Sequence, residues 1–140
     1  MIWGTFALVF AAAFTGASFH VNWVEQPARL KLDDEALLSE WGPSDSRGVA
    51  LLAAFALVAA IAGFIAYFET QDVRWAFGAL AILMSWPYAF FVMSPLDNQI
   101  RELRGANVAA ARALVRQWGL VESGLTGLGL LAVAFFVWAI

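Results

Sequence analysis

The sequence has no cysteine and only one histidine among its 140 residues. The absence of cysteine excludes a disulfide framework, a thiolate nucleophile and a cysteine-ligated metal centre. One histidine cannot build a multi-histidine metal site within a single chain. Charged residues make up only 14% of the chain, against about 25% in an ordinary soluble domain. This composition excludes a nucleic-acid-binding protein built on a basic surface.

Hydrophobic residues, in contrast, make up 62% of the chain, and aromatic residues 15%. A soluble domain of this size has too much surface per residue to hide so much apolar material. We therefore expect one domain, residues 1–140, whose surface faces lipid.

Four segments are long and apolar enough to cross a bilayer as helices, which takes about 20 residues each. They cover approximately residues 2–24, 48–68, 73–94 and 119–140. The first lacks the basic start of a secretory signal peptide and is long for one, so we expect it to be retained. The predicted fold class is an all-α membrane protein, a bundle of four transmembrane helices.

Basic residues gather on one side of the predicted bundle. Seven of the eight lie in two long loops, about 25–47 and 95–118, and only Arg74 lies in the short turn between the second and third spans. Basic loops remain in the cytoplasm. We therefore expect a multi-pass protein of the bacterial inner (plasma) membrane, with both termini on the outer side.

Each long loop carries a helix signal. The run from Leu32 to Trp41 has acidic residues in its first turn and a stop signal at Gly42-Pro43. In the second loop four arginines recur on one helical face. We expect a short amphipathic helix in each cytoplasmic loop. The arginine face would either bind anionic lipid head groups or attract an anionic substrate; it consists of Arg101, Arg104, Arg112 and Arg116.

Polar side chains in the first span recur every three or four residues, which places them on one face of a helix. In lipid such a face must point into the bundle or into a wet cavity. His20 lies on roughly the opposite face, where small residues let a neighbouring helix approach. The polar face consists of Thr15, Ser18, Asn22, Glu25 and Arg29.

Glu122, about one turn into the fourth span, lies at the same predicted depth as His20. A buried carboxylate must be paired or protonated. If His20 faces Glu122, the pair can act as a general base. Otherwise His20 is a packing residue and Glu122 reaches back to Arg116. Trp86 and Tyr88 of the third span are either interhelical filler or part of a substrate site.

Several short motifs follow one another along the chain. They are Asn22-Trp23-Val24-Glu25-Gln26-Pro27-Ala28-Arg29, Trp41-Gly42-Pro43-Ser44, Arg47-Gly48, Trp86-Pro87-Tyr88 with Pro95 and Asn98, and Trp118-Gly119. In this order they resemble the anthrone oxygenase-like family of small four-helix membrane proteins. The family usually has a His and an Arg in its last span, where this sequence has Glu122 and Leu125. It more often has an aromatic residue at the position of His20, and an Asn at the position of Ser85.

The resemblance implies oxidation of an anthrone, or a related polyketide-like or quinol-like aromatic, by dioxygen without a cofactor or a metal. His20 or Glu122 would be the base, with Asn22 and Tyr88 as hydrogen-bond donors. The substrate-binding residues would be Trp41 and Trp86, which form an aromatic slot, together with Glu25, Arg47 and Asn98 from the shared motifs.

Two other functions fit the same residues. The chain would then be a non-catalytic subunit that packs against itself or within a larger membrane complex, or a protein that binds a lipid, a quinone or haem. In every case we expect membrane lipids, and no nucleic acid, as partners. As an oxygenase the chain would also bind a hydrophobic aromatic ligand, and as a binding protein it would also hold a hydrophobic ligand.

Overall fold

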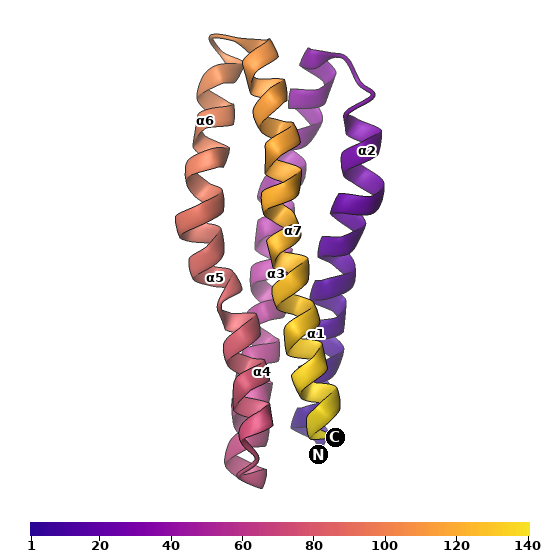
Figure 1. Cartoon of the computed structure of the whole chain (residues 1–140), viewed down its shortest axis with the longest axis vertical. Helices are drawn as coiled ribbons and strands as arrows, with labels where there is room; N and C mark the ends of the chain where they lie inside the picture. Colours follow the sequence, from indigo (N-terminus) through magenta and orange to yellow (C-terminus); the bar gives the residue numbers. More distant parts are fainter.

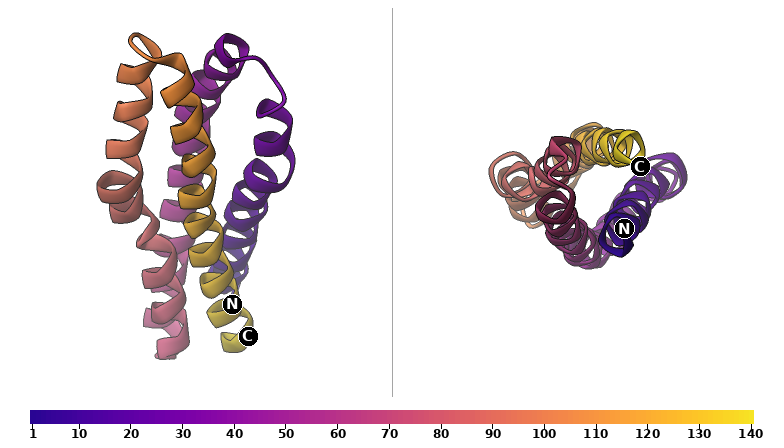
Figure 2. Two further views of the ribbon diagram at one scale, coloured as in Figure 1. Left: turned by 45° about the horizontal axis from the view of Figure 1, so that its top comes forward. Right: turned by 90° about the horizontal axis from the view of Figure 1, so that it is seen from below.

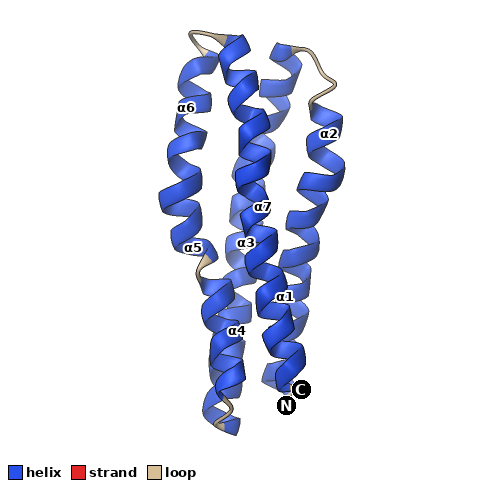
Figure 3. Cartoon of the chain, viewed as in Figure 1, coloured by secondary structure: helices blue, strands red, loops and turns tan.

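The computed structural model describes all residues, 1–140, and is helical almost throughout (Figures 1 and 3). The helices join end to end into four rods. The first rod consists of α1 (Ile2–His20), a π-helical turn η1 (Val21–Glu25) and α2 (Gln26–Arg29); the second is α3 (Asp34–Thr70); the third runs through α4 (Val73–Leu83), α5 (Ser85–Tyr88), a second π-helical turn η2 (Ala89–Met93) and α6 (Ser94–Arg104); the fourth is α7 (Val108–Ala139).

All four rods are long and apolar enough to cross a membrane. The predicted all-helical bundle with four such helices is therefore confirmed. The rods are longer than the predicted spans. The 37 residues of α3, for example, extend about 55 Å at 1.5 Å per residue. A hydrocarbon core is only about 30 Å thick. Both chain ends lie at the same end of the bundle (Figure 1).

The rods pack in a ring, in which α1 contacts α3 and α7, and α4 contacts the same two helices. Figure 2 shows this ring from the end. Small residues allow the close approach, since many fully buried positions are alanine, among them Ala7, Ala11, Ala56 and Ala132. At the turn after α3, Gln71 takes a left-handed backbone with φ of 59°.

The prediction of a separate loop helix that stops at Gly42-Pro43 is wrong, because α3 runs through both residues. Asp33 caps the helix by accepting a 2.8 Å hydrogen bond from the backbone N–H of Ala36. Pro43 removes one backbone donor, but it lies on the exposed side. Trp41 and Asp45 are buried on either side of Pro43, so the packing of one continuous inner face outweighs the break signal.

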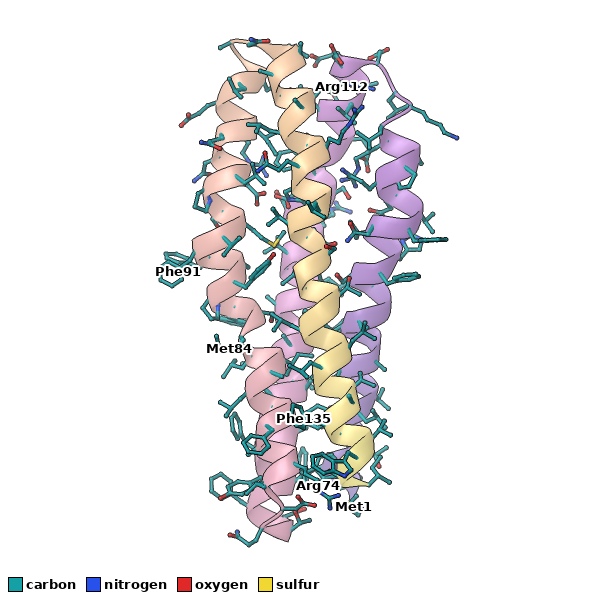
Figure 4. The ribbon with its side chains drawn as sticks, viewed as in Figure 1. Met1, Arg74, Met84, Phe91, Arg112 and Phe135 are labelled. Carbon is teal, nitrogen blue, oxygen red and sulfur yellow. The ribbon has the colours of Figure 1, made fainter.

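The prediction of one amphipathic helix carrying four arginines is also wrong. The chain turns between α6 and α7, and Asn107 caps α7 by accepting a 3.1 Å hydrogen bond from the backbone N–H of Ala110. Three of the arginines pair with acidic residues of α3, and Arg112 also donates to loop carbonyls between the rods (Figure 4). The ion pairs are Arg101–Asp45 at 3.3 Å, Arg104–Glu35 at 3.0 Å and Arg112–Asp34 at 3.2 Å.

Candidate functional site

The carboxyl group of Glu122 lies inside the bundle, where α7 faces the first rod, and is 2% exposed. The Ser18 hydroxyl donates a 2.9 Å hydrogen bond to Oε1 of this carboxyl. The Asn22 side-chain amide donates to Oε2. The hydroxyls of Ser18 and Thr126 are 2.7 Å apart. The predicted polar face of the first span thus meets the polar face of the fourth.

Glu122 has no ion-pair partner among the lysines, arginines and the histidine. A carboxyl so deeply buried depends on its hydrogen bonds for stabilisation. Two neutral donors from consecutive turns of the first rod supply them, which fixes the orientation of the group.

Two π-helical turns flank this site, η1, which contains Asn22, and η2 of the third rod. Each is followed two residues later by a proline, Pro27 or Pro95. Proline has no backbone N–H, so the carbonyl four residues earlier loses its usual helical donor, and the turn widens. Such widened turns are frequent at functional sites in other proteins.

An apolar cavity of about 250 Å³ lies between α3 and the third rod. Nine of its eleven lining residues are hydrophobic, including Phe14, Trp86 and Met93. A smaller cavity of about 20 Å³ shares four lining residues with it, namely Val49, Leu52, Met93 and Leu125, and is lined by Glu122 as well. The apolar cavity therefore borders on the space at Glu122.

Trp86 and Tyr88 lie near this space but are bonded to backbone. The Trp86 indole N–H donates to the Ala53 carbonyl at 3.2 Å, and the half-exposed ring lines the apolar cavity. The Tyr88 hydroxyl donates to the Val121 carbonyl rather than to Glu122. Its ring fits against Gly124 of α7, where a Cβ atom would overlap the hydroxyl.

His20 is exposed and does not pair with Glu122. Its Nδ1 lies 3.8 Å from Oε1 of Glu25, and the side chain is 57% exposed. The helical repeat explains this placement. Ser18 and Asn22, four residues apart, share the face toward α7, and His20 halfway between them points to the other side. The expectation that a neighbouring helix covers His20 is therefore wrong.

Arg29 is the most connected polar residue of the bundle, and its side chain is 1% exposed. Its guanidinium lies 2.8 Å from a carboxylate oxygen of Glu40 and 3.3 Å from one of Glu25. It also donates to the Ser44 hydroxyl at 3.1 Å and stacks 5.4 Å from the centre of the Trp118 ring. The sequence placed Arg29 on the polar face but did not identify this junction of three rods.

The remaining predicted site residues lie apart from Glu122. Trp41 is buried, with its ring edge-on to Trp118 at 6.0 Å and the Arg101 guanidinium 5.1 Å above it, so it packs between helices rather than lining the apolar cavity. Asn98 is exposed on α6, and Arg47 is exposed beside a cleft between α1 and α3.

Asp45 is a buried acidic residue that sequence reasoning missed. It lines the small cavity with Glu122, and its side chain is 3% exposed. The break signal at Gly42-Pro43 suggested a loop here, whereas the continuous helix turns Asp45 inward. No signal in the sequence indicated this burial, because the direction of the Asp45 side chain depends on the helix continuing through Pro43.

No group of three or more His, Asp or Glu side chains is placed so that it could hold a metal ion. No protein-family model, no curated protein and no solved structure matches this chain.

Proposed function

We propose that this chain is a membrane-embedded, cofactor-independent oxygenase similar to the anthrone oxygenases. Its substrate would be a hydroxylated, fused-ring aromatic compound with an acidic CH₂ group. The observation that carries the proposal is the buried carboxyl of Glu122, oriented by Ser18 and Asn22 beside an apolar cavity with an aromatic lining. A carbon acid needs such a base, held in place and shielded from water.

The reaction balances without any further reagent. The Glu122 carboxylate takes one proton from the CH₂ group, and the resulting carbanion transfers electrons to dioxygen as a C–O bond forms. Glu122 returns its proton to the peroxide anion, and the resulting hydroperoxide loses water, so that CH₂ and O₂ become C=O and H₂O. Asn22 has a second amide N–H beyond the one bonded to Glu122, and this donor can stabilise the developing oxyanion.

The substrate would enter from the lipid. Trp86 and Phe90 line the apolar cavity and are also exposed on the outside of the bundle. Neighbouring Phe91 points outward from η2 (Figure 4). An apolar aromatic compound partitions into the bilayer, so an opening on this surface gives it the shortest path. The apolar lining also favours binding of a quinone or lipid without turnover as a second candidate function.

We further propose that the chain lies in a bacterial inner membrane with the α6–α7 turn in the cytoplasm. The basis is the excess of basic residues at that end, where Lys31 and Arg116 stay exposed in addition to the three paired arginines. Only Arg74 lies near the other end, which is the end of the bundle that holds Met1 (Figure 4).

The test uses purified protein in lipid nanodiscs with a hydroxylated anthrone as the probe. We expect wild-type protein to accelerate oxygen uptake and the appearance of anthraquinone absorbance. Glu122→Gln keeps the shape and removes the base, so kcat should fall by about 10² to 10⁴. Glu69→Gln, at an exposed site near the end of α3, is the matched control and should keep full activity.

Two results would count against the oxygenase. Wild-type protein that leaves the spontaneous oxidation rate unchanged excludes this substrate class. Glu122→Gln with wild-type activity excludes the assigned base. If the inactive wild-type protein nevertheless binds a quinone in a saturable way, the second candidate function is favoured.

A further inference from the structure

A cleft of about 370 Å³, lined by both apolar and polar residues, lies between α1 and α3. None of its lining residues comes from α7. Its polar lining comes from both rods. His20 and Glu25 belong to the first, and Ser44 and Arg47 belong to α3. The Ser44 hydroxyl donates to the Glu25 carboxylate at 3.3 Å, and His20 lies 3.8 Å from the same carboxylate. These three side chains form a polar chain from the exposed mouth inward, and the buried Arg29 guanidinium donates hydrogen bonds to both Ser44 and Glu25.

The cleft borders on the small cavity at Glu122. The two share Val21, Ser44, Gly48 and Leu52 as lining residues. The small cavity has a volume of about 20 Å³, which suffices for one water molecule, since a water needs roughly 10–15 Å³ of such volume.

Two residues that line the small cavity each have a buried polar atom without a well-aligned hydrogen bond, namely Oδ1 of Asp45 and the indole Nε1 of Trp118. The carboxyl of Asp97 lies near both side chains, and one of its oxygens is also buried without a well-aligned bond. Buried polar atoms are almost always satisfied by protein or by water. An acceptor on Asp45, a donor on Trp118 and the carboxyl of Glu122 supply the two to four partners that a buried water needs. One water in the small cavity would complete the hydrogen bonds of this wall.

We propose that the α1–α3 cleft is the route along which Glu122 exchanges protons with the aqueous phase. Ser44 and Glu25 would relay the proton, and His20 would pass it to solvent at the mouth. The proposal rests on Glu122 being the base of the proposed function, because a buried carboxyl must be able to lose its own proton to water before it can take one from a substrate. The apolar cavity has no series of polar side chains that could carry a proton from Glu122 to water.

A substitution at Gly48 can test this route. It lines both the cleft and the small cavity, and a Cβ atom at this position would meet nothing within 4 Å. The Cβ atom of Gly48→Leu should therefore fit without a clash, and the rest of the side chain should narrow the passage between the two spaces. The substitution also raises helix propensity. Gly16→Leu is the matched control, because Gly16 is also helical with open space around its Cβ position but lies outside the route.

The experiment measures hydrogen–deuterium exchange of the Glu122 carboxyl by infrared spectroscopy. The carboxylic C=O band that disappears in Glu122→Gln belongs to Glu122, and its titration gives a pH at which the group is protonated. After a switch to D₂O at that pH, Gly48→Leu should slow the shift of this band at least about tenfold, equivalent to about 1.4 kcal/mol in the barrier. Gly16→Leu should exchange like wild type. Unchanged exchange in folded Gly48→Leu protein overturns the proposal.

A second measurement does not depend on Gly48→Leu folding. The chain has no cysteine, so Ser44→Cys creates a single thiol. A charged, water-soluble thiosulfonate reagent should modify it, whereas Gly127→Cys on the outer surface of α7, facing lipid, should stay unreactive. An inert thiol at position 44 overturns the proposal. Neither measurement uses a substrate, so a protein without oxygenase activity still reports whether the route exists.

Discussion

Replacing Arg29 by methionine should destabilise the bundle strongly. The guanidinium is almost fully buried and joins Glu25, Glu40 and Ser44 to the Trp118 ring. Methionine fills similar volume but leaves two carboxylates without their cation. Breaking a buried ion pair from one side costs about 3–5 kcal/mol. Both carboxylates are more than a third exposed, so water compensates in part and we expect the lower end, about 3 kcal/mol.

The assay is equilibrium unfolding in mixed micelles, followed by helical circular dichroism. Arg47→Met serves as the control, because Arg47 is exposed and forms no hydrogen bond or ion pair. The double variant Arg29→Met with Glu40→Gln should be less unstable than the sum of the two single variants, since contacting residues couple by about 0.5–3 kcal/mol. A loss in Arg29→Met no larger than in Arg47→Met would refute the view that this residue joins the rods.

Three further outcomes follow from individual contacts. Gly119→Ala should lower the free energy of unfolding by about 1–3 kcal/mol. The new Cβ atom would lie 2.7 Å from Nε2 of Gln26, which donates a hydrogen bond to the Val115 carbonyl. Gly127→Ala, in open space, should leave the free energy of unfolding unchanged in the same assay. Ser18→Ala removes a hydrogen-bond donor to Glu122. A hydrogen bond to a charged group contributes about 1.5–3 kcal/mol, so kcat with the anthrone probe should fall by about ten- to hundredfold. Unaltered turnover would show that Ser18 does not orient the base. Hydrogen bonds from Arg74 lower the pKa of Asp72, so the stability that this contact adds is present above the ordinary pKa of 3.8 and is lost as the pH falls through the lowered pKa. The melting temperatures of wild type and Asp72→Asn should therefore converge at acid pH. A difference that stays constant with pH would contradict the contact.

The sequence allowed the fold class and part of the site to be predicted. The lengths of the apolar runs identified four crossing helices, and the three- and four-residue spacing placed Ser18 and Asn22 on the inner face of the first rod. Glu122 was identified because a carboxyl within an apolar run must have a partner or a proton.

Other parts depended on tertiary contacts. Helical periodicity gives the relative direction of side chains but not which neighbour they meet, so it could not decide that Ser18 and Asn22, rather than His20, face α7. The proline in α3 obscured Asp45, because local break signals are weaker than the burial of a continuous face. Trp41 was assigned to an aromatic slot by resemblance, while its indole packs against Trp118 and Arg101.

The central claim is that Glu122 removes a proton from an apolar substrate inside the membrane. The most direct measurement compares the initial rate of anthraquinone formation from an ordinary anthrone and from one deuterated at its CH₂ group, in wild type and in Glu122→Gln. We predict that wild-type protein turns over the deuterated compound more slowly and that Glu122→Gln falls to the spontaneous rate with both. Equal enzyme-dependent rates in wild type and Glu122→Gln would contradict the account.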